Sequence, residues 1–363
     1  MIYRAIGLMS GSSLDGLDIA FVEFEETRGE WKYEIKAAEC IAYNKEWEEK
    51  LQSAKLLNAY DYLHLHSMYG KYIGEQVNNF IEAYQLHHKV QLISSHGHTV
   101  FHAPDKGFTA QLGDGAAIAA TTEINVVSDL RALDVALNGQ GAPIVPMGEK
   151  LLWKEYDYFL NIGGIANLSQ GGSTYIAYDV CPANRVLNML ANEAGLEYDK
   201  GGVLAAKGTI NEHLFELLNA QAYYELPAPK SLDNSFGTDI IYPLIKSASI
   251  STEDALHTYV MHIVFQIQKA VMSTSAENIS PKKILITGGG AFNTFLVEQL
   301  SNALAQLNIE VIVPDEHLVK YKEALIMALL GILRWREENT ILNSVTGAIR
   351  SSIGGAVWMG QAF

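Results

Sequence analysis

Residues 3–24 read Tyr3-Arg-Ala-Ile-Gly-Leu-Met-Ser-Gly-Ser-Ser-Leu-Asp-Gly-Leu-Asp-Ile-Ala-Phe-Val-Glu-Phe24. Two apolar runs, 5–9 and 19–24, flank a short stretch of glycines, hydroxyls and carboxylates, and this pattern predicts a β-hairpin. Glycines let backbone N–H groups approach an anion, and hydroxyls add further donors. We therefore predict a phosphate-binding hairpin, with an ordinary polar turn as the alternative. Asp15 and Asp18 would repel a bare phosphate, but they could hold Mg²⁺ or orient its waters.

The composition bounds the class of protein. A chain of 363 residues is long enough for two domains. With 48% hydrophobic and 18% charged residues, it can bury a full core. A net charge of −15 argues against a nucleic-acid partner but leaves an anionic ligand possible, because local backbone dipoles bind anions.

Cysteine usage and hydropathy indicate the compartment. Cys40 and Cys181 are too few for a disulfide framework or a cysteine-only zinc site. The N-terminus lacks the pattern of a signal peptide, and no uncharged run of 18 apolar residues occurs. We expect a soluble, cytoplasmic protein without a membrane partner.

The second half of the chain repeats the opening pattern. An apolar run over 156–162, a polar turn containing Gly163, Gly164 and Asn167, and a second strand ending at Asp179 follow one another. Two such hairpins suggest a duplicated fold that clamps a polyphosphate between two lobes. Asp179 is a candidate general base, or alternatively a cap of the predicted helix over 184–196.

A third glycine-rich turn follows the strand predicted over 283–287. Gly288-Gly-Gly290 then leads into a helix that reaches 307. Bare backbone lets an adenine or ribose lie flat, so this turn is a nucleotide-binding candidate. The spacing is not Gly-x-Gly-x-x-Gly, which disfavours a Rossmann dinucleotide site.

Three further segments carry polar groups beside predicted elements. His96, His98 and His102 follow a short buried strand over 90–94, and they fit either a metal site or a polar loop. Residues 129–143 cluster charges and glycines past a strand end, as a ligand site or as a surface connection. Glu323 stands in the first turn of a helix predicted over 322–334, where it could interact with the helix dipole or face a cleft.

Six motifs together resemble those of the anhydro-N-acetylmuramic acid kinase family. They occur in the same order as in the family and span nearly the whole chain. They are Gly7-Leu-Met-Ser-Gly-Ser-Ser-Leu-Asp-Gly-Leu-Asp18, Ser95-His-Gly97, Gly139-Gln-Gly-Ala-Pro143, Asn161-Ile-Gly-Gly-Ile-Ala-Asn167, Pro229-Lys-Ser231 and Gly288-Gly-Gly-Ala-Phe-Asn293. The resemblance implies an α/β, two-lobed, actin-like ATPase fold. Each lobe would be a mixed β-sheet flanked by helices, with ATP in the interlobe cleft. The predicted lobes are residues 1–130 with 340–363, and residues 131–339.

The family resemblance also implies the reaction. With ATP and Mg²⁺, water would open 1,6-anhydro-N-acetylmuramic acid while its O6 takes the γ-phosphoryl group, giving N-acetylmuramic acid 6-phosphate and ADP. Such a reaction needs a base for the water and charge neutralisation at the phosphate. The implied setting is peptidoglycan recycling in a bacterial cytoplasm by a homodimer.

The implied site residues fall into three groups. Asp179 would be the catalytic base. ATP and its phosphates would contact Gly11, Ser12, Ser13, Leu14, Asp15, Gly16, Leu17, Asp18, Gly163, Gly164, Asn167, Gly288, Gly289, Gly290 and Asn293. The substrate candidates are His96, Arg131, Asp134 and Glu323, and Mg²⁺ would be held with ATP, through water on Asp15 or Asp18.

Two loops depart from the family pattern. Asp179-Val-Cys-Pro-Ala-Asn184 stands where the family usually has Asp-Thr-Gly-Pro-Gly-Asn, and Lys230-Ser-Leu-Asp233 replaces the usual Lys-Ser-Thr-Gly. Lys230 and Ser231 lie in an extended, proline-bounded loop from which they could reach a ligand. The alternatives are an actin-fold kinase for another sugar or polyol, and an ATP-binding protein without catalysis.

Overall fold

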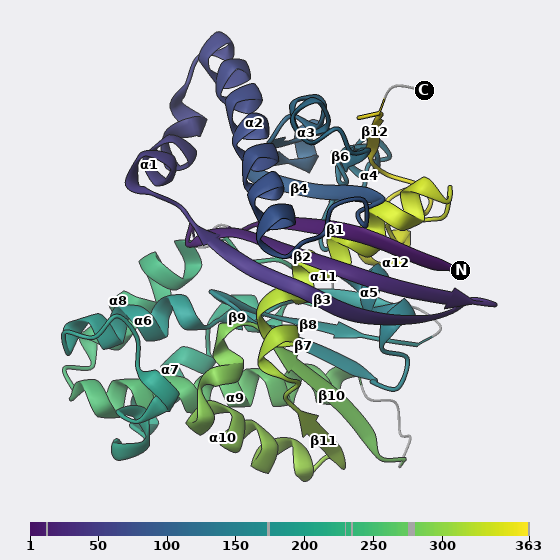
Figure 1. Ribbon diagram of the computed structural model, residues 1–363. Helices are drawn as coiled ribbons and strands as arrows, with labels where there is room; N and C mark the ends of the chain where they lie inside the picture. The colour runs from purple at the N-terminus through teal and green to yellow at the C-terminus, as the bar shows by residue number, and fades with distance from the viewer. Residues whose placement is uncertain (12–13, 173–174, 229, 234, 275–279, 362–363) are drawn as a thin grey trace. The chain divides into compact units, whose positions relative to one another are not determined.

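A computed structural model describes residues 1–11, 14–172, 175–228, 230–233, 235–274 and 280–361 (Figure 1). The chain forms two compact units, Met1–Trp153 with Tyr321–Phe363 (unit 1) and Lys154–Lys320 (unit 2). It returns from unit 2 to unit 1 inside one helix, α11 (Glu316–Trp335). These boundaries differ from the predicted lobes of 1–130 with 340–363 and 131–339, and the place of ATP stays a prediction.

Unit 1 is built on a seven-stranded sheet of order β12-β6-β4-β1-β2-β3, with β5 paired to β4. β1 is antiparallel to β2 and parallel to β4, β2 is antiparallel to β3, and β4 is parallel to β6. The strands are β1 (Ile2–Ser10), β2 (Gly16–Thr27), β3 (Glu30–Ala42), β4 (Leu92–Ala103), β5 (Phe108–Leu112), β6 (Val126–Ser128) and β12 (Ala356–Trp358).

Helices cover this sheet. They are α1 (Lys45–Ser53), η1 (Ala54–Leu56), α2 (Ala59–Ala83), η2 (Pro104–Lys106), α3 (Gly115–Thr122), α4 (Ala132–Ala136), α5 (Pro146–Leu152) and α12 (Asn343–Thr346), with most of α11. The longest, α2, begins at its cap Asn58 and buries Tyr69, Ile73, Val77 and Phe80. Their three- and four-residue spacing puts them on one face, which packs into the core of unit 1.

Unit 2 has a five-stranded sheet of order β11-β10-β7-β8-β9. β7 is antiparallel to β8 and parallel to β10, β8 is antiparallel to β9, and β10 is parallel to β11. The strands are β7 (Tyr158–Ile162), β8 (Ile165–Gln170), β9 (Ile176–Pro182), β10 (Lys282–Thr287) and β11 (Ile309–Ile312). This order and these directions match β6-β4-β1-β2-β3 of unit 1, so the two units share one topology.

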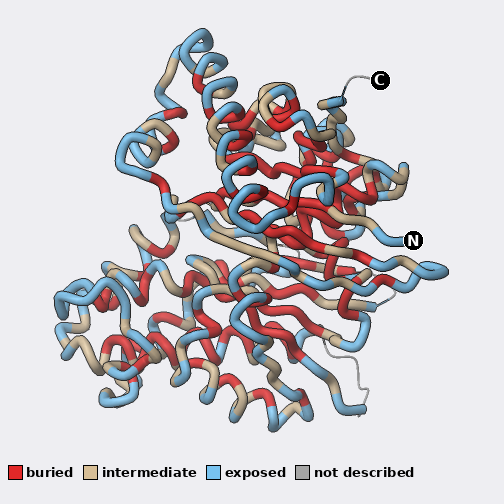
Figure 2. The backbone as a smooth tube through the Cα atoms, viewed as in Figure 1, coloured by how far each residue is buried: buried red, intermediate tan, exposed pale blue. Residues whose placement is uncertain are grey.

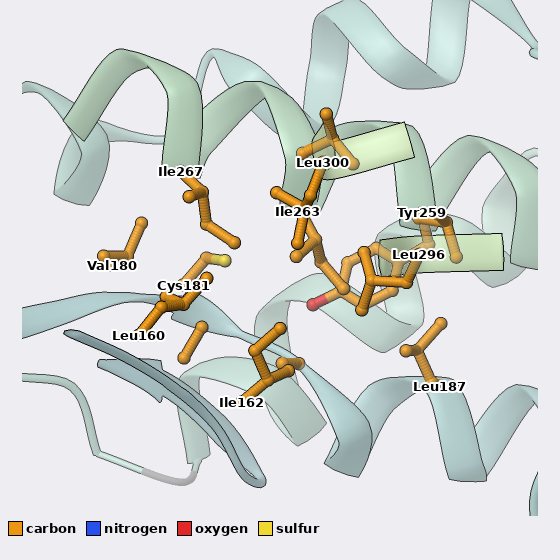
Figure 3. Packing of buried hydrophobic residues seen from close by; sticks show 14 of the residues in the cluster. Leu160, Ile162, Val180, Cys181, Leu187, Tyr259, Ile263, Ile267, Leu296 and Leu300 are labelled. Atoms are coloured by element: carbon orange, nitrogen blue, oxygen red, sulfur yellow. The ribbon is translucent and has the colours of Figure 1, made fainter. Parts of the chain in front are cut away.

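The helices of unit 2 enclose its core. They are α6 (Asn184–Glu193), η3 (Lys200–Gly202), η4 (Ala205–Lys207), α7 (Glu212–Asn219), η5 (Ala222–Glu225), η6 (Phe236–Ile241), α8 (Tyr242–Ser247), α9 (Thr252–Thr274), η7 (Gly289–Phe292) and α10 (Thr294–Ala305). Figure 3 shows strand residues such as Leu160 and Cys181 turned toward Ile263 and Ile267 of α9 and toward Leu296 of α10. The central strands of both sheets are largely buried, whereas the edge strands β3, β11 and β12 are mostly intermediate or exposed (Figure 2). The predicted α/β fold with two mixed sheets and flanking helices is confirmed.

Four local predictions are wrong. The strand predicted to end at Asp179 continues to Pro182, because β8 pairs with it beyond Asp179. The strand predicted to end at Ser94 continues to Ala103, because β5 pairs with its second half. Asn167 lies within β8 rather than in a turn, since β8 pairs on both sides. Glu323 lies inside α11, which begins at Glu316 after the cap Asp315, so the dipole of a first turn does not act on it.

Within the described residues, no helix is both long and apolar enough to cross a membrane.

Candidate active site

Asp179 lies on β9 with its carboxylate held at both oxygens. Asn167 is its cross-strand partner on β8, and the Asn167 side-chain amide donates to Oδ1. The backbone N–H of Leu232 donates to Oδ2 at 2.8 Å. Burial raises the pKa of Asp179, and these two donors oppose that rise. Helix α6 starts at Asn184 without a side-chain cap, so the helix-cap interpretation of Asp179 is wrong.

Gly163 and Gly164 form the turn between β7 and β8 in unit 2. The Gly163 carbonyl accepts from the N–H of Asn184 at 3.0 Å, and the Gly164 carbonyl accepts from the N–H of Ala183 at 2.8 Å. The turn is therefore tied to the start of α6. A Cβ at either glycine would meet no atom nearer than 3.6 Å, so packing does not require glycine at these two positions.

The triple glycine lies against the end of β7. Gly288 has a φ of 81°, and a Cβ there would come within 2.5 Å of the Asn161 side-chain oxygen, so only glycine fits. Gly289 and Gly290 open η7. The Asn293 side-chain oxygen accepts from the N–H of Leu296 at 3.1 Å and caps α10. The nucleotide contacts of these residues stay predictions.

In unit 1, the first hairpin joins β1 to β2. The carbonyl of Gly11 accepts from the N–H of Leu14, whose φ is 60°. Ser12 and Ser13 lie outside the described residues. Asp15 is exposed, whereas Gly16 and Leu17 are buried at the start of β2. The hairpin itself is confirmed, and its phosphate contacts stay a prediction.

The carboxyls of Asp15, Asp18 and Glu323 influence one another electrostatically near this hairpin in unit 1. Burial raises the pKa of Asp18 to about 6; the Cys40 thiol, which donates to it, opposes the rise, and the Asp15 and Glu323 carboxyls add to it. Burial likewise raises the pKa of Glu323, against the opposing charges of Lys322 and Arg131. Carboxyls that repel one another favour a nearby cation or a phosphate-bound metal.

Gly7 explains why Glu323 lies beside β1. A Cβ at Gly7 would fall 1.8 Å from the carbonyl oxygen of Ala324, so α11 touches the strand backbone directly. The neighbouring Glu323 is thereby brought toward the hairpin strands. The predicted substrate candidate is thus within the electrostatic reach of Asp18.

The buried His96 and the half-buried Arg131 form a hydrogen-bonded pair in unit 1. The Arg131 Nε–H donates to His96 Nε2 at 2.8 Å, and Nη1 donates to the Gly141 carbonyl at 2.7 Å. His96 Nδ1 faces the Gly97 carbonyl at 2.8 Å, so this nitrogen carries the proton and the ring is neutral. Burial, with the Arg131 charge, lowers the pKa of His96 to about 3, and burial lowers that of Arg131 to about 10.

Asp134 is fully buried beside this pair. Its Oδ2 accepts from the N–H of Gly141 at 2.8 Å, and its Oδ1 accepts from the Thr346 hydroxyl at 2.8 Å. These bonds hold the loop whose carbonyl binds Arg131. Residues 129–143 therefore supply a buried cluster rather than only a surface connection. Direct substrate contact by Asp134 stays a prediction.

The three histidines of β4 do not converge. His96 binds Arg131, His98 Nδ1 lies 3.1 Å from the Ser10 hydroxyl, and His102 Nδ1 lies 3.1 Å from the Thr109 hydroxyl. Throughout the part of the chain that the structure describes, no three His, Cys, Asp or Glu side chains gather as metal ligands. The histidine metal site is not supported, and the polar-loop alternative fails because these residues lie in a strand.

Two contacts of Asp179, from the Leu232 N–H and the Tyr223 hydroxyl, were not predicted from the sequence. The Leu232 N–H carries no side-chain signature, because every residue except proline has this donor. Tyr223, whose hydroxyl donates to the Asp179 carbonyl at 2.6 Å, lies far from Asp179 in sequence. The extended loop at Lys230 was the one sequence signal that pointed to this region.

Comparisons with known proteins agree with the motifs. A family model described as anhydro-N-acetylmuramic acid kinase matches residues 3–360. Proteins of that name from Hydrogenovibrio crunogenus and Sulfurovum sp. are 33% and 31% identical, over 97% and 98% of this chain and 97% and 99% of theirs. A third, from Haemophilus influenzae, is 30% identical over 97% of each chain. The solved (R)-2-hydroxyglutaryl-CoA dehydratase component A of Acidaminococcus fermentans aligns over 91% of this chain and 97% of its own, at 14% identity. The TM-score of this alignment is 0.46.

Proposed function

The chain belongs to the anhydro-N-acetylmuramic acid kinase family, and we propose that it converts 1,6-anhydro-N-acetylmuramic acid, ATP and water into N-acetylmuramic acid 6-phosphate and ADP. The observation that carries the assignment of the base is the Asp179 carboxylate, held by Asn167 and Leu232 at the position that the family motif assigns to the base. The three relatives named above share this activity in their names, and no observation favours another sugar or a non-catalytic role.

Asp179 takes a proton from the attacking water in this reaction. The water oxygen bonds to the anomeric carbon as the carbon–O6 bond breaks, and O6 then bonds to the γ-phosphorus as ADP leaves. The raised pKa of Asp179 fits a base, because its carboxylate is desolvated and more basic than an exposed one. Its two hydrogen bonds fix the direction of the carboxylate.

The turns of the two units bind the nucleotide in our proposal. The hairpin around Gly11 contacts the phosphates from unit 1, and the turns at Gly163 and Gly288 contact the nucleotide from unit 2. Mg²⁺ bound with ATP neutralises the phosphate charge. Asp18 fits an outer position near the metal, because burial and the Asp15 and Glu323 carboxyls raise its pKa and a cation would favour its ionised form.

Arg131 is our candidate for the carboxylate of the sugar's lactyl group. Its buried guanidinium uses Nε and Nη1 for His96 and Gly141, which fixes its plane. A guanidinium held in this way is preorganised for a carboxylate. Arg131→Met should raise the KM for the sugar at least tenfold and leave the KM for ATP nearly unchanged. The reason is that it removes a hydrogen bond to a charged group, which contributes about 1.5–3 kcal/mol.

Coupled ADP release tests the function. The protein, ATP, Mg²⁺ and the anhydro sugar should yield ADP and a ring-opened 6-phosphate, which mass spectrometry identifies. Asp179→Asn should lower kcat at least about 10²-fold, because it removes the base. An exposed matched control, Asp105→Asn, should keep wild-type turnover. A wild-type protein that forms no 6-phosphate would refute the function, and an active D179N would refute the role of Asp179.

We also propose that the enzyme acts as a homodimer in the cytoplasm, as its family membership suggests. Light scattering on a sizing column should give twice the mass of 39.9 kDa. A single-chain mass at assay concentration would refute the dimer.

A further inference from the structure

One stretch of unit 2 contacts Asp179 at three polar groups. The Tyr223 hydroxyl donates to the Asp179 carbonyl at 2.6 Å. The Asp179 N–H donates to the Lys230 carbonyl at 3.0 Å, and the Leu232 N–H donates to Oδ2 at 2.8 Å. We call Tyr223, Lys230 and Leu232 the clasp. It holds the backbone of Asp179 on both sides and its carboxylate at one oxygen.

The two ends of the clasp are joined to each other through Lys230. Its Nζ donates to the Tyr223 carbonyl at 3.1 Å and lies 4.5 Å from the centroid of the Tyr223 ring. An ammonium over an aromatic face is attracted to it, more strongly where water is partly excluded. The Lys230 side chain therefore connects the tyrosine to the loop that carries the Leu232 donor.

The Tyr223 end rests on the core of unit 2. Its side chain is buried, and its ring packs edge-on against Tyr224 at 5.7 Å between centroids. The Tyr224 hydroxyl lies 3.0 Å from Nε2 of His262 on α9, a buried histidine. Tyr223 is thus connected through Tyr224 to His262 on α9. Lys230 in turn connects Tyr223 to the loop that carries Leu232.

We propose that Lys230 and Tyr223 are positioning residues that keep the Leu232 N–H on Oδ2 of Asp179. The proposal rests on the proposed function, in which Asp179 is the base. With Oδ1 bound to Asn167 and Oδ2 bound to Leu232, rotation of the carboxylate would break one of the two bonds. The remaining lone pairs keep one direction toward the attacking water, as positioning of a catalytic group requires.

The clasp also accounts for a departure from the family pattern. Leu232 stands where the family usually has threonine, and the contact with Asp179 uses the main chain. A change of side chain at this position keeps the donor, whereas proline removes it. The substituted loop therefore retains its hold on the base.

The charged surroundings of the clasp define the expected pH effect. Asn167 and Leu232 oppose the burial that raises the pKa of Asp179. Burial and the nearby Lys269 lower the pKa of Lys230, against the opposing charge of Glu225. Loss of the Leu232 donor should raise the pKa of Asp179 further, because a donor favours the charged carboxylate.

Lys230→Met and Leu232→Pro test the clasp in the full-length protein. Each should lower kcat about tenfold with little change in the KM for ATP, and should move the acid limb of kcat to higher pH. Carbon-13 NMR titration of the Asp179 carboxyl, assigned with D179N, should show its pKa raised. Lys230→Arg should restore most of the turnover, because it keeps a cation over the ring.

Lys269→Met is the matched control. Lys269 forms an exposed ion pair with Glu225, 2.8 Å away, next to the clasp but outside it. It should keep wild-type kcat and the wild-type titration. A folded K230M with unchanged kcat and unchanged Asp179 titration would overturn the proposal, even if L232P fails to fold. The NMR titration needs no turnover, so it decides the clasp separately from the kinase reaction.

Discussion

Asn167 and Asp179 face each other across β8 and β9, and the amide of the first donates to the carboxylate of the second. This pairing puts a neutral donor opposite a buried acid. It supports the ionised form of Asp179 without adding a charge that would cancel its basicity. The sheet register, rather than a loop, thus sets one half of the base's environment.

Asn167→Ala should therefore weaken catalysis through the titration of Asp179. Loss of the amide donor raises the pKa of the carboxyl, so a larger fraction is protonated and unable to act as a base at a given pH. We expect kcat to fall about tenfold near its acid limb and that limb to move to higher pH. Gln170→Ala, on the same strand, should leave the pH profile in place; an unshifted profile in N167A would contradict the prediction.

Asp18→Asn should stabilise the protein above about pH 6. The pKa of Asp18 is raised from 3.8 to about 6, so between these values the folded state binds its proton more tightly than the unfolded chain. The free energy of unfolding of the wild type therefore falls as pH rises through this window, and D18N lacks that fall. Urea unfolding on both sides of the window measures the difference.

The control for this prediction is Asp105→Asn on the exposed η2 turn. It should follow the wild-type pH dependence. Equal slopes for D18N and the wild type would mean that Asp18 does not titrate in this window. If Mg²⁺ and ATP approach Asp18, they should stabilise the wild type more than D18N, because a cation favours the carboxylate.

Gly7→Ala should destabilise unit 1. The added methyl would overlap the Ala324 carbonyl, so α11 must move off β1. Overpacking of this kind costs about 3 kcal/mol, and the displaced Glu323 should lower turnover as well. Gly171→Ala, where the nearest atoms to a Cβ are 3.8 Å away, should change the melting temperature far less. Equal melting temperatures for G7A and wild type would refute the contact.

Replacing one partner of the buried ion pair of unit 1 should lower the free energy of unfolding far more than replacing one partner of an exposed pair. Lys322 Nζ lies 2.6 Å from Glu149 Oε1, with side chains 5% and 3% exposed. Lys322→Met leaves a buried carboxylate, which costs about 3–5 kcal/mol. Lys320→Met on the same helix breaks an exposed pair with Glu316 and should cost about 0.5 kcal/mol or less. A double-mutant cycle with Glu149→Gln measures the coupling, and similar costs for the two lysines would contradict this difference.

Much of this fold follows from local pattern. The apolar runs around Gly11 and Gly163 predicted the hairpins because strands alternate buried and exposed positions. The helices predicted over 184–196 and up to 307 correspond to α6 and α10. The strand that carries Asp179 was also predicted, but its predicted end at Asp179 is wrong, because β9 continues to Pro182.

The remaining features depend on contacts between distant residues. β4 extends through His98 because β5 pairs with it, although its composition resembles a loop. Tyr223 and Leu232 reach Asp179 only after the chain folds, and a main-chain donor leaves no mark in the residue type. The neutral form of His96 depends on Arg131 and Gly97, which no spacing rule brings together.

The division of the chain into units has a consequence for biosynthesis. Unit 2 is continuous, whereas unit 1 needs Tyr321–Phe363 to complete its sheet with β12 and to cover β1 with α11. Because a ribosome delivers the chain from its N-terminus, the inserted unit 2 can fold while the unit that precedes it still lacks its last strand. Unit 1 therefore keeps apolar strands exposed until residues 321–363 have been synthesised, and nascent chains truncated before Tyr321 should depend most on chaperones.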